Sequence, residues 1–262
     1  MPPKRPLYED IGRSYSRTRR EDPRVAAPVH AALGDAETVV NVGAGTGSYE
    51  PADRMVVAVE PSDAMRRQRR GRSHRVVHGV AEALPFPDLA FDAAMAVLTV
   101  HHWTDPVAGL REMRRVSRRQ VVLFFEPLRT HAFWALGYFP EALDVPSEQN
   151  PPGEELLRRV LAVDRVEPVL VPRDCVDGFG VAFWARPEAY ADPEVQAGMS
   201  WLAVLPPEVR RRGAERLTAD LVSGAWDDRY GHLRRQSTYD GGYRLAIAGS
   251  PAGTVDHKES TD

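Results

Sequence analysis

The sequence contains one cysteine, Cys175, among its 262 residues. A lone thiol excludes a disulfide within the chain and a multi-thiolate metal site, and it agrees with a reducing compartment, so we expect a cytoplasmic protein. We interpret Cys175 as a small buried apolar side chain. No run of about eighteen or more apolar residues is present, which disfavours a membrane-spanning helix, and residues 1–6 lack the apolar core of a signal peptide.

Lysine is also scarce, and arginine supplies almost all of the positive charge, which we interpret as the coding bias of a GC-rich bacterium. The net charge is −3, so no overall positive field attracts nucleic acid. The chain has no helix-turn-helix pattern, no Cys/His zinc spacing and no P-loop. We therefore expect no nucleic-acid partner, no membrane partner and no metal, in a monomer or a homodimer.

What the sequence does contain is a glycine-rich stretch behind an apolar, β-branched run. Residues 38–42 predict a buried strand, and Gly-x-Gly-x-Gly follows at residues 43–47. Glycine lets backbone N–H groups in a tight turn approach a ligand closely. A second predicted strand, residues 55–59, ends in Glu60, which is placed to accept hydrogen bonds from a ribose diol. Together they predict a nucleoside site, and Ser48 replaces the third glycine of the dinucleotide fingerprint, which disfavours NAD.

The sequence resembles the class I S-adenosylmethionine (SAM)-dependent methyltransferases, in particular the small-molecule and quinone-type group. Four segments within roughly residues 8 to 126 carry the resemblance, in the family's order: NVGAGTG (41–47), VVAVEPSDAM (56–65), AEALPFPDLAFD (81–92) and LTVHHWTDP (98–106). The resemblance implies SAM as the cofactor and S-adenosylhomocysteine (SAH) as its product. It also implies cofactor contacts from Tyr15, Arg19, Asn41, Gly43, Ala44, Gly45, Gly47, Glu60, Pro61, Met65, Ala81, Glu82 and Val97.

Two positions depart from the family pattern, because acids commonly stand where this chain has Asn41 and Val80. Asn41 can still accept a hydrogen bond through its amide oxygen, but the lost charge predicts a weaker hold on SAM. Tyr15 and Arg19 match a family helix that covers the methionine end of SAM, and the alternative is a solvated helix with Tyr15 packed on the core. Glu82 is either an adenine-side contact or a solvated loop acid.

Alternating predicted strands and helices indicate an α/β protein with a Rossmann-like, doubly wound, seven-stranded sheet. Aromatic residues are dense between residues 128 and 152 and again beyond residue 173, which favours an apolar or aromatic acceptor pocket under a lid. The alternative is that these aromatics form the core of a helical subdomain. We expect an N-terminal helical cap over 1–37, a SAM-binding core over 38–172, a helical lid insertion over 173–242, the last strand over 243–249 and a disordered tail over 250–262.

The candidate catalytic side chains follow the fourth and fifth predicted strands, because ligands of open α/β sheets bind outside the carboxyl ends of the strands. His101, His102 and Glu126 stand there, and a neutral imidazole can take a proton from a hydroxyl or phenol. Adjacent residues of an extended segment point to opposite sides, so we expect one histidine, preferably His101, to face the pocket. Asp174 and Asp177 are further candidate bases.

The expected function is therefore methyl transfer from SAM to a small-molecule acceptor, in specialised metabolism. Two alternatives stay open. The first is a SAM- or SAH-binding protein without methyl transfer, a sensor or partner subunit, which the losses at Asn41 and Val80 favour. The second is a cyclase or isomerase on the same fold.

Overall fold

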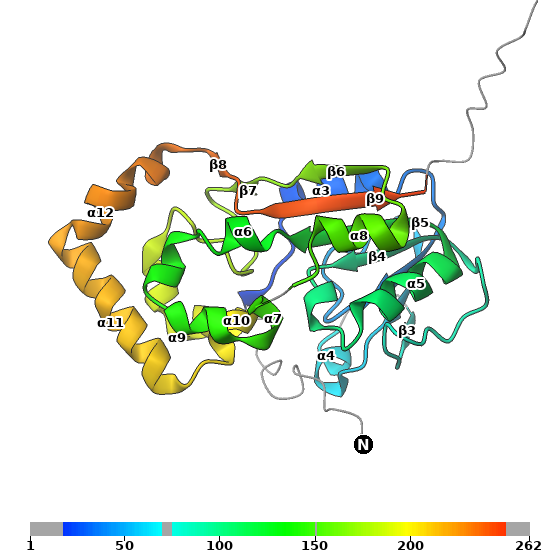
Figure 1. Ribbon diagram of the computed structural model, residues 1–262, viewed down its shortest axis with the longest axis horizontal. Helices are drawn as coiled ribbons and strands as arrows, with labels where there is room; N and C mark the ends of the chain where they lie inside the picture. The colour runs from blue at the N-terminus through cyan, green and yellow to red at the C-terminus, as the bar shows by residue number, and fades with distance from the viewer. Residues whose placement is uncertain (1–17, 70–74, 150, 250–262) are drawn as a thin grey trace, which may run out of the picture.

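The computed structural model describes residues 18–69, 75–149 and 151–249. Its centre is a seven-stranded sheet (Figure 1). In spatial order the strands are β3 (Arg75–Val77), β2 (Met55–Val59), β1 (Thr38–Val42), β4 (Phe91–Val97), β5 (Ser117–Phe125), β9 (Tyr243–Ala248) and β6 (Arg165–Pro168). The first five strands of this order pair in parallel. Strand β9 runs antiparallel to both of its neighbours, β5 and β6. The predicted doubly wound sheet is confirmed.

Helices cover both faces of the sheet. Val39 packs in one core with helix α3 (Pro23–Ala32), whereas Val40, one residue later, packs in a second core with α5 (Pro106–Val116) and α8 (Glu154–Leu161). In Figure 1, α5 and α8 lie in front of the strands and α3 lies behind them. Strands buried on both faces need apolar residues at nearly every position, which explains the continuous apolar runs of the sequence.

Polar caps define where the helices next to the carboxyl edge of the sheet begin. Ser62 accepts a hydrogen bond from a backbone N–H in the first turn of α4 (Asp63–Arg67), and Asp105 does the same for α5. Such a side chain satisfies one of the free backbone donors at a helix start. The caps also end the loops that precede these helices, and those loops carry the residues of the site.

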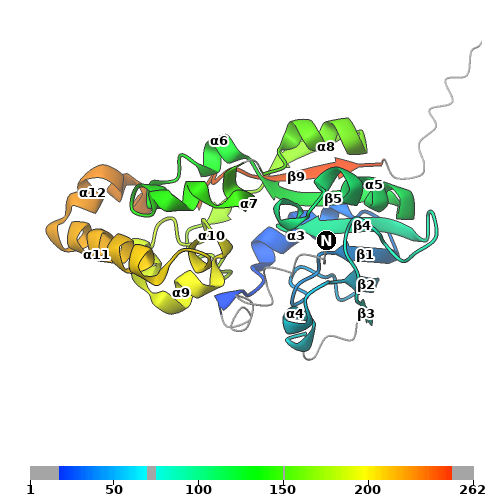
Figure 2. The same cartoon turned by 60° about the horizontal axis from the view of Figure 1, so that its bottom comes forward.

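A second group of elements, which we call the helical extension, consists of residues 127–149 after β5 and residues 169–242 before β9. It lies beside the sheet in both views (Figures 1 and 2). No helix in the described part of the chain is long and apolar enough to cross a membrane. The elements of the extension are α6 (Pro127–Thr130), η3 (Trp134–Gly137), η4 (Pro140–Asp144), α7 (Pro146–Gln149), β7 (Val171–Pro172), η5 (Pro187–Ala191), α9 (Pro193–Gly198), α10 (Ser200–Ala203), α11 (Pro207–Ser223), α12 (Ala225–Tyr230), η6 (Gly231–Arg235) and β8 (Thr238–Tyr239).

The extension begins earlier than the predicted boundary at residue 173. Strand β7 pairs antiparallel with β8, with Val171 opposite Tyr239, so the two ends of the insertion belong to one small sheet. Residues 127–149 pack in the same group although they precede α8. These contacts join segments far apart in the chain, and local periodicity carries no sign of them.

Part of the aromatic content forms the core of the extension itself. Trp184, Tyr190 and Trp226 are 0% exposed. The ring of Trp134 lies 5.2 Å from the rings of both Tyr190 and Trp226, measured between centroids, and its Nε1 donates to Trp184 O at 2.9 Å. Ring pairs at such distances stabilise a core beyond the area that they bury. The alternative of an aromatic subdomain core therefore applies to these residues, while other aromatics face a cavity.

Candidate active site

A cavity opens at the carboxyl ends of β1, β2 and β4, and we call it the cofactor cavity. Asn41 and Gly47 do not line it, and Tyr15 lies outside the described residues. The glycine loop also contributes Thr46 and Ser48, which were not among the predicted contacts. The predicted cofactor residues that do line the cavity are Arg19, Gly43, Ala44, Gly45, Glu60, Pro61, Met65, Ala81, Glu82 and Val97.

The glycine loop is held against the end of β2 by its own backbone. Gly43 N and Ala44 N donate to Val59 O at 2.9 and 3.0 Å. Gly43 has a φ of 69°, and a Cβ at this position would lie 2.2 Å from Thr99 Oγ1. Only glycine fits there, in conformation and in space. The loop thus presents backbone to the cavity, as the sequence predicts.

Glu60 faces the loop from the end of β2. Its Oε2 accepts from Gly45 N at 2.7 Å and its Oε1 accepts from Ser62 N at 2.8 Å. Burial raises the pKa of this carboxyl, and the two N–H donors oppose that shift. A carboxylate oxygen can accept two hydrogen bonds, so each oxygen retains the capacity to accept one from a ribose hydroxyl. The residues present therefore fit a nucleoside.

A buried ion pair supports the glycine loop from behind. Arg69 contacts Glu50 Oε1 and Oε2 at 2.7 and 2.8 Å, and the two side chains are 4% and 0% exposed. Asn41 Nδ2 donates to Glu50 Oε1 at 3.0 Å, and Arg69 also donates to Gly45 O at 3.3 Å. The family commonly has an acid at the position of Asn41, and Glu50 brings a carboxylate next to that position. No motif marks Glu50, so the sequence reasoning missed it.

Asp177 joins the extension to the cofactor cavity. Arg19 Nε lies 2.7 Å from Asp177 Oδ1, and the Tyr49 hydroxyl donates to Asp177 Oδ2 at 2.5 Å. Asp177 is 0% exposed, while Arg19 and Tyr49 line the cavity. Asp174 lies at the surface and pairs with Arg24 at 2.6 Å. Neither aspartate lines the cofactor cavity or the second cavity described next, so the structure does not support them as candidate bases.

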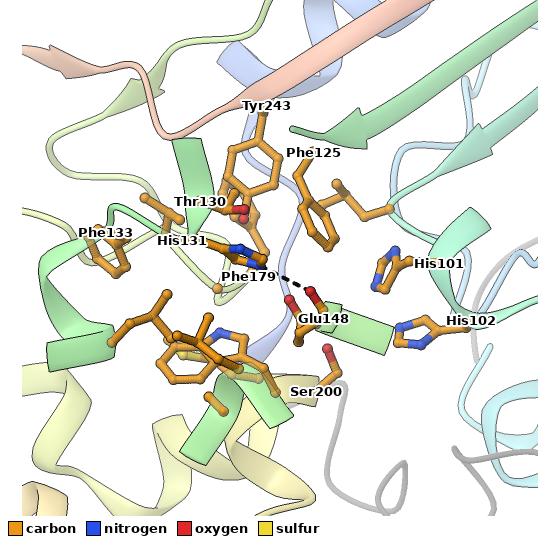
Figure 3. A pocket seen from close by; sticks show the side chains of 18 of the residues that line it. His101, His102, Phe125, Thr130, His131, Phe133, Glu148, Phe179, Ser200 and Tyr243 are labelled. Atoms are coloured by element: carbon orange, nitrogen blue, oxygen red, sulfur yellow. Dashed lines mark hydrogen bonds between the residues drawn. The ribbon is translucent and has the colours of Figure 1, made fainter. Parts of the chain in front are cut away.

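A second cavity, which we call the acceptor cavity, lies between the sheet and the helical extension (Figure 3). Its aromatic wall consists of Phe125, Phe133, Phe179, Trp201 and Tyr243. Its polar lining consists of Arg19, His101, His102, Thr130, His131, Glu148 and Ser200. Arg19, Leu98 and His102 line both cavities, so the cavities meet at these three residues.

The histidine pair lies in the 3₁₀ turn η2 (Val100–His102) and not in the extended segment that we expected. Consecutive residues of such a turn are about 120° apart, because it has about three residues per turn. The rings of His101 and His102 are 3.8 Å apart between centroids, and both line the acceptor cavity. The expectation that only one of them faces the pocket is therefore wrong.

Both imidazoles are held neutral at neutral pH. Burial lowers the pKa of His102 to about 4, and the positive charge of Arg19 adds to this effect. Burial, His102 and Arg19 lower the pKa of His101 well below its ordinary value. Neutral rings can accept protons, although a lowered pKa makes each a weaker base. Among the described residues, no three His, Cys, Asp or Glu side chains are grouped as a metal site.

The carboxylates of Glu126 and Glu82 accept hydrogen bonds from backbone N–H groups of neighbouring segments. Glu126 Oε1 accepts from Glu154 N at 2.8 Å at the start of α8, and Glu126 lines neither cavity. This position does not support the expected catalytic role, because the side chain turns from the sheet edge toward α8. Glu82 Oε1 accepts from Thr104 N and Asp105 N at 2.8 and 3.0 Å while it lines the cofactor cavity.

His131 and Glu148 are polar residues of the acceptor cavity that no sequence motif marks. His131 Nε2 is bonded to the backbone Glu148 O at 3.0 Å, the dashed line of Figure 3. Burial raises the pKa of the Glu148 carboxyl to about 7.

Cys175 is fully buried and lines neither cavity. Burial raises the pKa of its thiol to about 12, so it stays an unreactive thiol.

Comparison with known proteins identifies the family. A family model described as a methyltransferase domain matches residues 40–125. A crystal structure from Anabaena variabilis ATCC 29413, provisionally described as a methyltransferase of an antibiotic biosynthesis pathway, is 34% identical with a TM-score of 0.80, over 89% of this chain and 99% of that chain. The chain belongs to the class I SAM-dependent methyltransferases. SAM is accordingly its cofactor.

Curated relatives of this methyltransferase match over shorter stretches. A demethylmenaquinone methyltransferase from Mycobacterium sp. (strain KMS) is 34% identical over 111 residues, which are 40% of this chain and 48% of that protein. A malonyl-[acyl-carrier protein] O-methyltransferase from Serratia marcescens is 31% identical over 108 residues, 38% of this chain and 42% of that protein. The chain thus spans less than half the length of these relatives, whereas the match to the Anabaena structure includes most of the helical extension.

The position of Glu60 leads to a first prediction. We expect Glu60→Ala to weaken SAH binding by about 1.5–3 kcal/mol, roughly 10- to 150-fold, because charge-assisted hydrogen bonds to the ribose are lost. Isothermal titration calorimetry measures the affinity, and NAD should give no binding heat. Asp63→Ala is the matched control, since that carboxylate pairs with Arg66 at the surface of the adjacent helix. SAH affinity that is the same in both variants would contradict the role of Glu60.

Proposed function

We propose that this methyltransferase transfers a methyl group from SAM to a small, partly apolar or aromatic acceptor in the acceptor cavity, as part of specialised metabolism. The observation that carries the proposal is the common boundary of the two cavities at Arg19, Leu98 and His102. Methyl transfer requires the nucleophile in line with the departing sulfur, with reacting atoms about 3–3.5 Å apart. Adjoining cavities provide for such an approach.

The cofactor cavity offers partners for each end of SAM, which when bound supplies a methyl group activated by a sulfonium. Glu60 is placed to accept hydrogen bonds from the ribose hydroxyls. Arg19, which is oriented by Asp177 at 2.7 Å, offers guanidinium donors to the methionine carboxylate. Ala81 and Glu82 line the cavity on the side that we assign to the adenine. Together these residues orient the methyl end toward the boundary.

Leu98 shapes that boundary through an uncommon backbone conformation. It follows β4 with a φ of 50°, and its N–H donates to Leu123 O at 2.8 Å, which ties the turn to β5. A non-glycine residue with positive φ is uncommon, and such residues cluster at functional sites. We infer that the turn places an apolar side chain between the cavities and excludes water from the point of transfer.

The histidine pair supplies the base for acceptors that must lose a proton. Neutral His102 borders both cavities, so it is placed nearer to the point of transfer than His101. A positioned base contributes about 10²–10⁴-fold to the rate. The transition state disperses positive charge, and aromatic faces such as those of Phe125 and Tyr243 stabilise a nearby cation.

The structure also bears on the alternative of a binding protein without methyl transfer. One reason for that alternative was the missing acid at Asn41, but Glu50 brings a carboxylate to within 3.0 Å of the Asn41 amide nitrogen. Val80, at the rim of the cofactor cavity, still lacks the acid that the family commonly has there. The acceptor cavity, which a SAM sensor does not need, favours methyl transfer.

Acceptor-dependent SAH release tests the proposal. We expect the protein with SAM to release SAH when given members of a panel of hydroquinones, phenols and aryl amines, and mass spectrometry should find the acceptor one methyl group heavier. The control is the same reaction with a Gly43→Val variant, whose side chain cannot fit beside Thr99. SAH binding with no turnover on any member would favour a sensor, and a product of unchanged mass would favour a cyclase or isomerase.

A further inference from the structure

We propose that the acceptor carries a basic amine and that Glu148 binds its protonated form within the aromatic wall of the acceptor cavity. This inference rests on the proposed function, because it names the chemical class of the acceptor for the same cavity. No sequence motif points to Glu148, and its role follows from its position and from the charges around it.

Glu148 lies on α7, which packs against η4 and against the histidine turn η2. In Figure 3 its side chain lies between the histidine pair and His131. Within the described residues, its carboxylate has one hydrogen-bond partner, the Ser147 hydroxyl at 3.5 Å, and no ion-pair partner. The carboxylate therefore faces a cavity with its hydrogen-bonding capacity largely unused.

The buried carboxylates Glu50, Asp177 and Glu60 all have strong partners. Glu50 lies against Arg69 at 2.7 Å, Asp177 lies against Arg19 at the same distance, and Glu60 accepts from two backbone N–H groups. A desolvated carboxylate is costly unless it is paired, and it otherwise neutralises. Glu148 follows this rule, since burial raises its pKa to about 7. A cationic ligand would provide the missing partner and return the carboxylate to its ionised form.

Among the described lining residues, Glu148 is the one carboxyl of the acceptor cavity, and it has no cationic partner. Arg19 is the one arginine or lysine of that lining, and Asp177 balances its charge. The pKa values of His101 and His102 are both lowered by burial, so these rings are uncharged at neutral pH. A single negative charge in a cavity selects a cation and disfavours a carboxylate or phosphate.

The aromatic wall suits the same ligand. Phe125, Phe133, Phe179, Trp201 and Tyr243 line the cavity that Glu148 enters. Aromatic faces attract an ammonium group within about 6 Å of the ring centre, and the attraction is stronger when the cation is desolvated. An uncharged quinone or phenol would use the wall alone and leave Glu148 unpaired. An apolar or aromatic amine uses both parts of the cavity.

A matched pair of probes tests the inference on the SAH-saturated protein. The probes are 2-naphthylmethylamine and the uncharged 2-naphthylmethanol, which have the same ring system. At neutral pH we expect calorimetry to show the amine bound roughly 10- to 150-fold more tightly than the alcohol, the range for a hydrogen bond to a charged group. Glu148→Gln should remove this preference by weakening the amine, with the affinity for the alcohol unchanged. Glu148→Asp should retain part of it.

Glu141→Gln is the control variant, because Glu141 precedes the same cavity wall on η4 but pairs with Arg212 outward. It should keep the full preference for the amine, and the SAH affinity and melting temperature of all variants should match the wild type. An unchanged preference in Glu148→Gln, or tighter binding of the alcohol in the wild type, would overturn the inference. Methyl transfer to an acceptor without an amine that is as fast as transfer to its matched amine would overturn it and leave the proposed function standing, whereas SAH binding without any transfer would end the proposed function itself.

Discussion

Alanine at His102 is expected to lower kcat by about 10²–10⁴-fold with SAH affinity nearly unchanged. His102 borders both cavities, so its loss removes the base at the point of transfer while the cofactor contacts of Glu60 and the glycine loop remain. Steady-state turnover on a phenolic acceptor and calorimetry with SAH measure the two effects. The control is His232→Ala, because His232 is exposed on η6 of the extension.

The histidine pair also predicts the pH dependence of the reaction. The neutral imidazole is the active form, so kcat/KM stays constant above the pKa of the base and falls as the pH drops through it. Burial and Arg19 lower the pKa of His102 to about 4, so the acid limb should lie far below the ordinary histidine value of about 6.5. An uncharged acceptor keeps the ionisation of Glu148 out of the profile. His102→Ala should lose the limb.

His101→Ala separates the two histidines. The sequence favours His101 as the base, whereas the boundary between the cavities favours His102. Large loss of turnover in His101→Ala with little loss in His102→Ala would reverse the assignment. Undiminished turnover in both variants would mean that positioning alone drives the reaction.

Removing the carboxylate of Glu50 should destabilise the fold and release the glycine loop. We expect Glu50→Ala to lower the free energy of unfolding by about 3–5 kcal/mol, because Arg69 is left as an unpaired buried charge. Urea denaturation measures the loss. The control is Glu215→Ala, which breaks an exposed pair with Arg211 on α11 and should cost less than about 1 kcal/mol.

A double variant separates stability from the positioning of the loop. Glu50→Met with Arg69→Met replaces the ion pair by apolar side chains, and such replacements are often neutral or stabilising. We expect much of the stability to return while SAH affinity stays low, because Arg69 no longer donates to Gly45 O. Wild-type SAH affinity in the double variant would show that the pair serves stability alone.

The sequence alone was sufficient to predict the parts of the site that depend on residues close together in the chain. An apolar run predicts a strand buried on both faces, and alternate glycines after it predict a close-approach loop, because both follow from the conformations that neighbouring residues permit. Glu60 could be placed because the carboxyl ends of parallel strands share one edge of the sheet. For the same reasons the seven strands and a nucleoside site could be predicted from the residues themselves, whereas SAM as the cofactor was implied by the resemblance of four segments to the methyltransferase family.

Only the tertiary structure decided what depends on pairing across the chain. The partners of Glu50 and Asp177 lie 19 and 158 residues away along the sequence, and no local period encodes such distances. The histidine pair differs from the prediction because a short 3₁₀ turn and an extended segment look alike over three residues. Glu148 stands on the four-residue helix α7, which has no motif around it, and it became a candidate only when folding placed it, without a cationic partner among the described residues, against the aromatic wall. Burial and charge balance arise from packing, and they decide the acceptor side of the site.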